Sequence, residues 1–78
     1  MIKEEQEKRI LNEFMGMMVK KAQRVNVFLK SGVRLSGFIL DYDSECIAVH
    51  DHPNGEASTI VVRTCMASIT KDVPRQGL

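Results

Sequence analysis

Val25-Asn-Val-Phe-Leu-Lys-Ser-Gly-Val-Arg-Leu-Ser-Gly-Phe-Ile-Leu-Asp-Tyr-Asp43 is the stretch of this sequence that decides its fold. Residues 25–30 have aliphatic side chains at alternate positions, which is typical of a strand that buries one face. Ser31-Gly32 predicts a two-residue hairpin turn, because glycine readily takes the positive φ that such turns need. A second strand continues the alternation from Val33 to Ile39, and Gly37 falls where a bend or a close backbone approach is expected.

A helix is expected ahead of this hairpin, at residues 2–23. Its apolar side chains recur at three- and four-residue spacing, which favours a face that packs on the rest of the protein. Acidic residues gather near its start and basic residues near its end, as the helix dipole favours. Gly16 indicates a bend or a close contact. The expected packing face consists of Ile10, Phe14, Met17 and Met18, widened by Leu11 and Met15.

Three more short strands are expected after the hairpin, at 46–51, 58–64 and 65–70, with a loop at 50–56. A helix followed by five short strands predicts a mainly β fold, namely a strongly bent five-stranded small β-barrel with an N-terminal helical cover. The expected domain spans 1–72, with the helix at about 2–23 and the barrel at about 24–72. Residues 73–78 are expected to form a disordered end.

Size and charge limit what this chain can be. Seventy-eight residues form one small domain with a modest core, which usually needs additional stabilisation. Cys46 and Cys65 lie in apolar runs and not at metal-ligand spacing, so buried free thiols in a reducing compartment are expected. The N-terminal region lacks a long uncharged apolar run, which predicts a cytoplasmic protein without a membrane partner. A net charge of +1 argues against broad electrostatic capture of nucleic acid but allows local patches.

Association of several copies is expected from the strand edges. Thr59-Ile-Val-Val62 is apolar, β-prone and uncharged, so it would be an aggregation hazard as an unpaired edge. Pairing this segment with strand 65–70 of a neighbouring copy would satisfy both backbones and produce a head-to-tail ring.

The stretch 25–43 resembles the first Sm motif of the Sm-like proteins, and most closely its bacterial Hfq version, because the turn, the glycine and the aspartate fall at the family spacing. The resemblance covers roughly residues 11–72. It implies an Sm-like, SH3-like barrel assembled into a ring, typically a hexamer. It also implies an RNA chaperone and post-transcriptional regulator that promotes pairing of small RNAs with messenger RNAs and needs no cofactor.

In the Hfq family the distal face binds adenine-containing RNA. The resemblance places Phe28 where a tyrosine usually stacks on adenine, and Arg34 where a lysine is usual. The alternative for Phe28 is packing against a neighbouring subunit, and for Ser36 it is simple exposure to solvent. The distal candidates are Phe28, Ser31, Gly32, Val33, Arg34 and Ser36, with Thr59 and Ser68 as weaker ones.

The proximal face of that family binds uridine-rich RNA around the pore, and here the pattern departs. Where the family has Tyr-Lys-His, this chain has Val62-Arg63-Thr64. Where the family has a Gln-Phe pair, this chain has Ser44-Glu45, and Leu11 takes the place of a glutamine in the helix. Arg63 preserves a cation, whereas the Glu45 carboxylate disfavours a phosphate-bearing strand. Ser44, Arg63 and Thr64 are the proximal candidates, and adenine-rich RNA is expected to bind better than uridine-rich RNA.

The outer rim, where the Hfq family contacts RNA, has three candidates in this chain: Lys20, Lys21 and Arg24. We call these three residues the basic cluster. As RNA contacts they would bind phosphate without reading sequence. The alternative is a solvated helix end whose cations suit the dipole. Asp43 matches the acidic position of the motif and is expected to hold a turn by accepting backbone N–H groups.

Catalytic and metal-binding chemistry is not expected. His50 and His52 would supply two imidazoles, which make an incomplete zinc site, so a loop with ordinary histidines is favoured and no metal is predicted. The sequence shows neither a nucleophile–base arrangement nor a glycine-rich phosphate loop, so it does not predict an enzyme. The alternative to the RNA chaperone is a divergent Sm-like ring that binds RNA weakly and acts mainly through protein partners.

Overall fold

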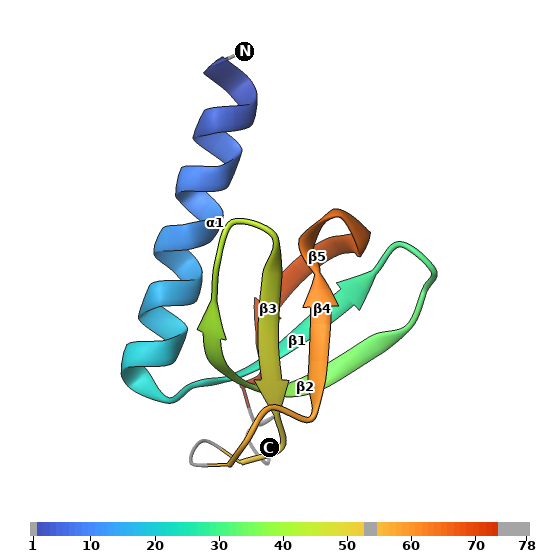
Figure 1. Ribbon diagram of the computed structural model, residues 1–78. Helices are drawn as coiled ribbons and strands as arrows, with labels where there is room; N and C mark the ends of the chain where they lie inside the picture. The colour runs from blue at the N-terminus through green and yellow to red at the C-terminus, as the bar shows by residue number, and fades with distance from the viewer. Residues whose placement is uncertain (1, 53–54, 74–78) are drawn as a thin grey trace, which may run out of the picture.

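The computed structural model describes residues 2–52 and 55–73, and it consists of one helix followed by five short strands (Figure 1). A 3₁₀ turn, η1, connects the last two strands. Pro53, Asn54 and most of the expected disordered end, residues 74–78, lie outside the described residues. The elements are α1 (Ile2–Lys21), β1 (Arg24–Leu29), β2 (Arg34–Tyr42), β3 (Cys46–His50), β4 (Thr59–Val62), η1 (Arg63–Cys65) and β5 (Met66–Lys71).

The strands form a single antiparallel sheet in the order β4-β3-β2-β1-β5. The register shifts between Ile39 and Asp41 where β2 pairs with β3, and between Phe28 and Leu29 where β1 pairs with β5. Such irregularities bend strands and increase their twist. The expected helix and five antiparallel strands are therefore confirmed, and β4 and β5 lie at the two ends of the strand order.

The helix packs on the sheet through a stripe that differs from the expected one. Met15 and Met18 are fully buried beside the strand residues of the core, but Ile10 and Met17 are 58% and 50% exposed. The sequence allows two overlapping stripes at helical spacing, because apolar residues occupy neighbouring positions. The structure selects the one that runs through Leu11, Phe14, Met15 and Met18.

The end of α1 comes slightly before residue 23. The Gln23 backbone N–H donates to the Met18 carbonyl (2.9 Å) and the Ala22 N–H to the Val19 carbonyl (3.1 Å), which is the Schellman pattern. Ala22 has φ of 49°, a left-handed conformation that this motif usually assigns to glycine. The cap is formed at the expense of backbone strain in Ala22.

The β1–β2 hairpin has a three-residue loop, 30–32, so the expected two-residue turn is wrong. Gly32 N–H donates to the Leu29 carbonyl and Leu29 N–H to the Val33 carbonyl, both at 2.9 Å. Gly32 has φ of +96°, the positive value expected for it. A turn followed by one positive-φ residue is the usual three-residue hairpin, and Ser31-Gly32 alone does not distinguish it from the two-residue form.

Two more boundaries differ at the end of β4. The expected strand 58–64 stops at Val62, and Arg63–Cys65 forms η1, so Thr64 and Cys65 are not strand residues. Cys46 is only partly buried and Cys65 is exposed, so the expectation of buried thiols is wrong for Cys65. Both cysteines are free. The reason is the chain reversal between two short strands, which brings residues 63–65 out of the sheet.

The glycines of the hairpin and helix mark close contacts. A Cβ at Gly37 would lie 2.6 Å from the His50 carbonyl oxygen and 3.2 Å from a Val49 methyl group, so the expected backbone approach is confirmed. A Cβ at Gly16 would lie 3.0 Å from the Tyr42 hydroxyl, which donates to the Asn12 carbonyl. The atom next to Gly37 belongs to the backbone and cannot easily move, whereas the atom next to Gly16 belongs to a side chain.

Gly37→Ala is expected to lower the free energy of unfolding by about 1–3 kcal/mol, because the new methyl group overpacks against the β3 backbone. Urea unfolding at a fixed protein concentration measures the change. Gly16→Ala is the matched control: a side-chain hydroxyl can move away, and alanine gains about 1 kcal/mol of helix propensity. A Gly37→Ala variant as stable as the Gly16→Ala variant would contradict the close approach.

Candidate nucleic-acid interface

Most of the distal candidates gather at one end of the sheet. Phe28 lies opposite Arg34 on β2 and opposite Ser68 on β5, so these three side chains form a row across three strands. Phe28 is partly exposed, whereas Arg34 and Ser68 are exposed. The loop residues Ser31 and Gly32 and the half-exposed Val33 continue this surface. We call it the hairpin face; it comprises Phe28, Ser31, Gly32, Val33, Arg34, Ser36 and Ser68.

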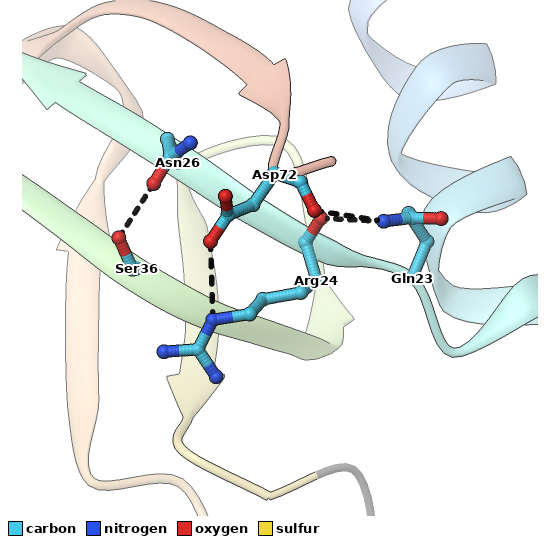
Figure 2. Close-up of polar contacts among 5 residues, drawn as sticks. All are labelled: Gln23, Arg24, Asn26, Ser36 and Asp72. Atoms are coloured by element: carbon cyan, nitrogen blue, oxygen red, sulfur yellow. Dashed lines mark hydrogen bonds and ion pairs between the residues drawn. The ribbon is translucent and has the colours of Figure 1, made fainter. Parts of the chain in front are cut away.

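Ser36 belongs to the next row of the same face. Its hydroxyl donates to the Asn26 side-chain oxygen at 2.5 Å (Figure 2). Thr70 of β5 pairs with Asn26 from the other side. Ser36 is therefore only partly exposed and is held in place, in contrast to the alternative of simple solvent exposure. This polar row borders the Phe28 row and supplies hydrogen-bonding groups beside the aromatic ring.

Thr59 is not part of the hairpin face in one chain. It lies on β4, which is the opposite end of the strand order from β5 with Ser68. The sequence places both residues in strands but carries no information on which sheet edge each strand occupies.

The proximal candidates line one cavity of about 680 Å³. Arg63 and Thr64 belong to η1, and Ser44 lies in the β2–β3 turn. Lys8 and Leu11 of α1 complete the wall, so the structure adds a cation that sequence reasoning missed. No local signal marks Lys8, because it comes into place only when the helix packs on the sheet. The Glu45 cavity, as we call it, is lined by Lys8, Leu11, Ser44, Glu45, Val62, Arg63 and Thr64.

Asp43 organises the turn next to this cavity, as expected. Its carboxylate accepts the backbone N–H groups of Glu45 (2.8 Å) and Cys46 (2.7 Å). The Arg63 guanidinium donates to the Asp43 carbonyl at 2.6 Å. These hydrogen bonds, first that of Glu45 and then that of Cys46, lower the pKa of the Asp43 carboxyl below its ordinary 3.8, and the charge of Arg63 acts in the same direction.

The basic cluster is divided by an ion pair. Lys20 and Lys21 are exposed in the last turn of α1, but Arg24 Nε lies 3.2 Å from Asp72 Oδ2 (Figure 2). The Arg24 guanidinium also stands 5.7 Å from the centre of the Phe38 ring. Sequence reasoning missed Asp72 because the pair is far apart along the chain. Arg24 is therefore less free to contact phosphate than the two lysines.

Gln23 strengthens this junction between the end of α1 and the end of β5. Its side-chain amide donates to the Arg24 carbonyl (3.0 Å) and, at 3.4 Å, to the Asp72 carbonyl (Figure 2). The Asp72 backbone N–H donates in turn to the Arg24 carbonyl at 2.8 Å. The junction is held by several contacts and not by the ion pair alone.

The two histidines form a local contact. The His52 backbone N–H donates to His50 Nδ1 at 2.9 Å, and the ring centres are 5.8 Å apart. Among the side chains of residues 8–52 and 55–73, no group of three or more His, Cys, Asp or Glu residues could hold a metal ion. Within the same part of the chain, no helix is both long and apolar enough to cross a membrane.

Comparison with solved structures identifies the architecture. A 1.55 Å crystal structure of the pleiotropic translational regulator Hfq matches with a TM-score of 0.69 and 16% sequence identity, over 81% of this chain and 91% of that chain. The chain has the fold of Hfq. An Hfq protein from Anabaena sp. matches with a TM-score of 0.66 and 20% identity, over 77% of this chain and 92% of that one. The sequence matches no protein-family model and no curated protein. The resemblance to Hfq seen in the sequence is thus confirmed in the fold, at low identity.

Asp43→Ala is expected to destabilise the protein at neutral pH, because two backbone N–H groups lose their acceptor. The folded-state pKa of this carboxyl is lowered, so its stabilising contribution is complete above its ordinary pKa near 3.8 and is lost as pH falls through the folded-state value. Urea unfolding measured from about pH 7 down to about pH 3 should therefore show a weaker acid-side decrease in the variant.

Asp43→Asn is the matched control for this prediction. The amide oxygen can still accept the two N–H groups, so more stability is retained at neutral pH than with alanine, but the side chain does not titrate. Identical acid-side pH dependence in the wild type and the asparagine variant would contradict the assigned role.

Proposed function

We propose that this protein is a non-enzymatic, RNA-binding Sm-like protein that acts in the cytoplasm as an RNA chaperone and post-transcriptional regulator. It binds single strands on a ring-shaped oligomer, a hexamer by analogy with Hfq, and promotes pairing of small RNAs with messenger RNAs. The observation that carries the proposal is the position of Phe28 on an Hfq fold, in a row with Arg34 and Ser68 on the hairpin face. The two Hfq structures also support the expectation of a protein without catalytic activity.

The hairpin face has the chemistry that a single-stranded base needs. Base–aromatic stacking contributes about 1–3 kcal/mol per base, and Phe28 is partly exposed on this face. Arg34 is exposed beside that ring and can reach phosphate or a base edge. The Asn26–Ser36 row offers polar groups next to the stacked base. Together with the resemblance to the adenine-binding distal face of Hfq, this combination supports adenine-rich RNA as the ligand of the hairpin face.

The two free ends of the sheet support assembly into a ring. Ile60 and Val62 on β4 are 58% and 47% exposed, and β4 and β5 each pair with one strand within the described chain. Joining β4 of one copy to β5 of the next makes a head-to-tail contact, which closes into a ring when the rotation permits. Thr59 of one copy would then lie near the strand that carries Ser68 in its neighbour. Repetition around the ring would add weak single-chain sites into useful affinity.

The alternative is a divergent ring that binds RNA weakly and acts through protein partners. Three observations favour it: the net charge is only +1, Arg24 is paired with Asp72, and Glu45 lines the cavity next to Arg63. The salt dependence of RNA binding separates the two functions. The affinity of an RNA chaperone that uses Lys20 and Lys21 should fall steeply as salt is added. In a plot of the logarithm of the binding constant against the logarithm of the salt concentration, each phosphate contact should contribute about 0.7 to the downward slope.

Phe28→Ala is expected to weaken binding of adenine-rich RNA by about 1–3 kcal/mol per stacked base, because the ring that stacks on the base is removed. Fluorescence anisotropy with a labelled adenine-rich oligonucleotide measures the loss, and wild-type protein should bind it better than a uridine-rich one. Phe28→Leu removes the aromatic face but retains apolar volume, and Phe28→Tyr retains stacking.

The pattern among these variants decides the role of Phe28. Stacking requires the tyrosine variant to bind like wild type and the leucine variant to bind like alanine. Wild-type affinity in all three, with assembly unchanged, would show that Phe28 serves packing. An intact protein without affinity for any RNA at low salt would reject the chaperone function in favour of the protein-partner alternative.

Val62→Pro is expected to prevent ring assembly while leaving the fold of each chain intact. The Arg63 backbone N–H donates to the carbonyl of Glu45, which directly precedes β3. Because N–H groups alternate in direction along a strand, the Val61 N–H also points toward β3 and the Val62 N–H points away from it. Val62 has φ of −79°, within the range of about −65 ± 15° that proline takes. Light scattering measures assembly, and circular dichroism measures the fold.

Two control variants make this test specific. Val62→Ala keeps the outward N–H and should assemble, whereas Val61→Pro removes an N–H used by β3 and should unfold the chain. A Val62→Pro protein with the same molecular mass in solution as the wild type would show that the β4 edge is not the interface.

A further inference from the structure

The Glu45 cavity combines charges of both signs with apolar walls. Lys8 and Arg63 are its cations, Glu45 is its acid, and Leu11 and Val62 are its aliphatic residues. Ser44 and Thr64 add hydroxyl groups. Its volume of about 680 Å³ lies within the range of roughly 300–1,000 Å³ that is usual for small-molecule sites. The cavity is therefore large enough for one nucleotide and offers it both apolar walls and polar groups.

Glu45 has a fixed backbone and an available carboxylate. Its N–H donates to the Asp43 side chain at 2.8 Å, and its carbonyl accepts the Arg63 backbone N–H at 2.8 Å. Among the side chains of residues 8–52 and 55–73, the Glu45 carboxylate has no ion-pair or hydrogen-bond partner. The residue thus presents a pair of acceptor oxygens at a defined place in the cavity wall.

A carboxylate distinguishes the four RNA bases by their Watson–Crick edges, which is where proteins read unpaired RNA. Guanine presents two adjacent donors, N1–H and the 2-amino group, which match the two carboxylate oxygens. Uracil presents one N–H between two carbonyl oxygens, and these would face the negative charge. Adenine and cytosine each offer one amino group next to a ring nitrogen acceptor. Charge-assisted, paired hydrogen bonds therefore favour guanine.

We propose that the Glu45 cavity binds a guanine nucleotide of the RNA, with the Glu45 carboxylate accepting hydrogen bonds from guanine N1–H and the 2-amino group. Leu11 and Val62 supply apolar contact for the base, and Lys8 and Arg63 supply cations for its phosphate. Glu45, which disfavours uracil and phosphate, becomes the residue that selects the base. The inference rests on the proposed RNA-binding function and names the base that this second site takes.

The test uses nucleoside monophosphates as probes of the intact, assembled protein. Titration of ¹⁵N-labelled protein with GMP should shift the backbone amides of Ser44, Glu45 and Thr64. UMP is expected to bind at least about tenfold more weakly than GMP. IMP, which lacks only the 2-amino group, is expected to bind about tenfold more weakly than GMP, because one charge-assisted hydrogen bond is lost.

Glu45→Gln provides the decisive variant. An amide presents one acceptor and one donor, so GMP affinity should fall about tenfold while UMP affinity stays equal or rises, because the amide matches the uracil edge. Glu56→Gln removes the same charge in the loop at the other end of β3 and should change neither ligand (Figure 1).

Equal affinities for GMP and IMP, tighter binding of UMP, or shifts confined to the hairpin face would overturn the guanine site. Adenine-rich RNA binding, measured on the same wild-type and Glu45→Gln samples, keeps the two proposals apart. If that binding is intact but GMP is not preferred, the guanine inference fails alone. If no RNA or nucleotide binds, the proposed function fails with it.

Discussion

The Asp43 carboxylate makes the contact on which one whole end of the molecule depends. By accepting two successive backbone N–H groups it closes the turn between β2 and β3. The backbone carbonyl of Asp43 accepts a hydrogen bond from the Arg63 guanidinium. The Arg63 backbone meanwhile donates to the Glu45 carbonyl. Turn, 3₁₀ segment and the start of β3 are thereby joined, although the residues come from separate parts of the chain. The Glu45 cavity takes its shape from this arrangement.

The other end of the molecule is organised around a different kind of contact. The end of β5 is attached to the start of β1 and the end of α1 through Arg24, Asp72 and Gln23. Exposed ion pairs contribute little on their own, and the backbone and amide hydrogen bonds around this one explain why the geometry is retained. The ion pair has an electrostatic consequence as well: Asp72 neutralises the positive charge of Arg24, on a protein whose net charge is only +1.

The sequence predicted the elements that depend on short-range pattern. The helix, the strand alternation around Val25, the close approach at Gly37 and the turn-holding role of Asp43 each follow from a few neighbouring residues, and all are present. The loop length after β1 was not decided by Ser31-Gly32, because two hairpin types accept that pair. The packed stripe of α1 was likewise undecided, since two rotations of the helix satisfy the same spacing.

The sequence pattern did not predict the contacts that join distant segments of the chain. The Arg24–Asp72 pair and the approach of Lys8 to the η1 segment depend on the completed sheet and on how the helix lies against it. Which candidate residues lie together was therefore predicted best within one hairpin, and least well where three elements meet. Thr59 shows the same limit, because its strand is identifiable but the edge it occupies is not.

The junction at Asp72 also determines where a label can be attached. Because the Asp72 N–H donates to the Arg24 carbonyl, the described part of the chain ends close to the start of β1. The start of α1 lies at the far end of the helix, which extends past the sheet (Figure 1). A fluorophore attached at position 73, for example through Val73→Cys, would therefore lie next to the Arg24–Asp72 junction. A fluorophore attached in the first turns of α1 would leave that junction uncovered.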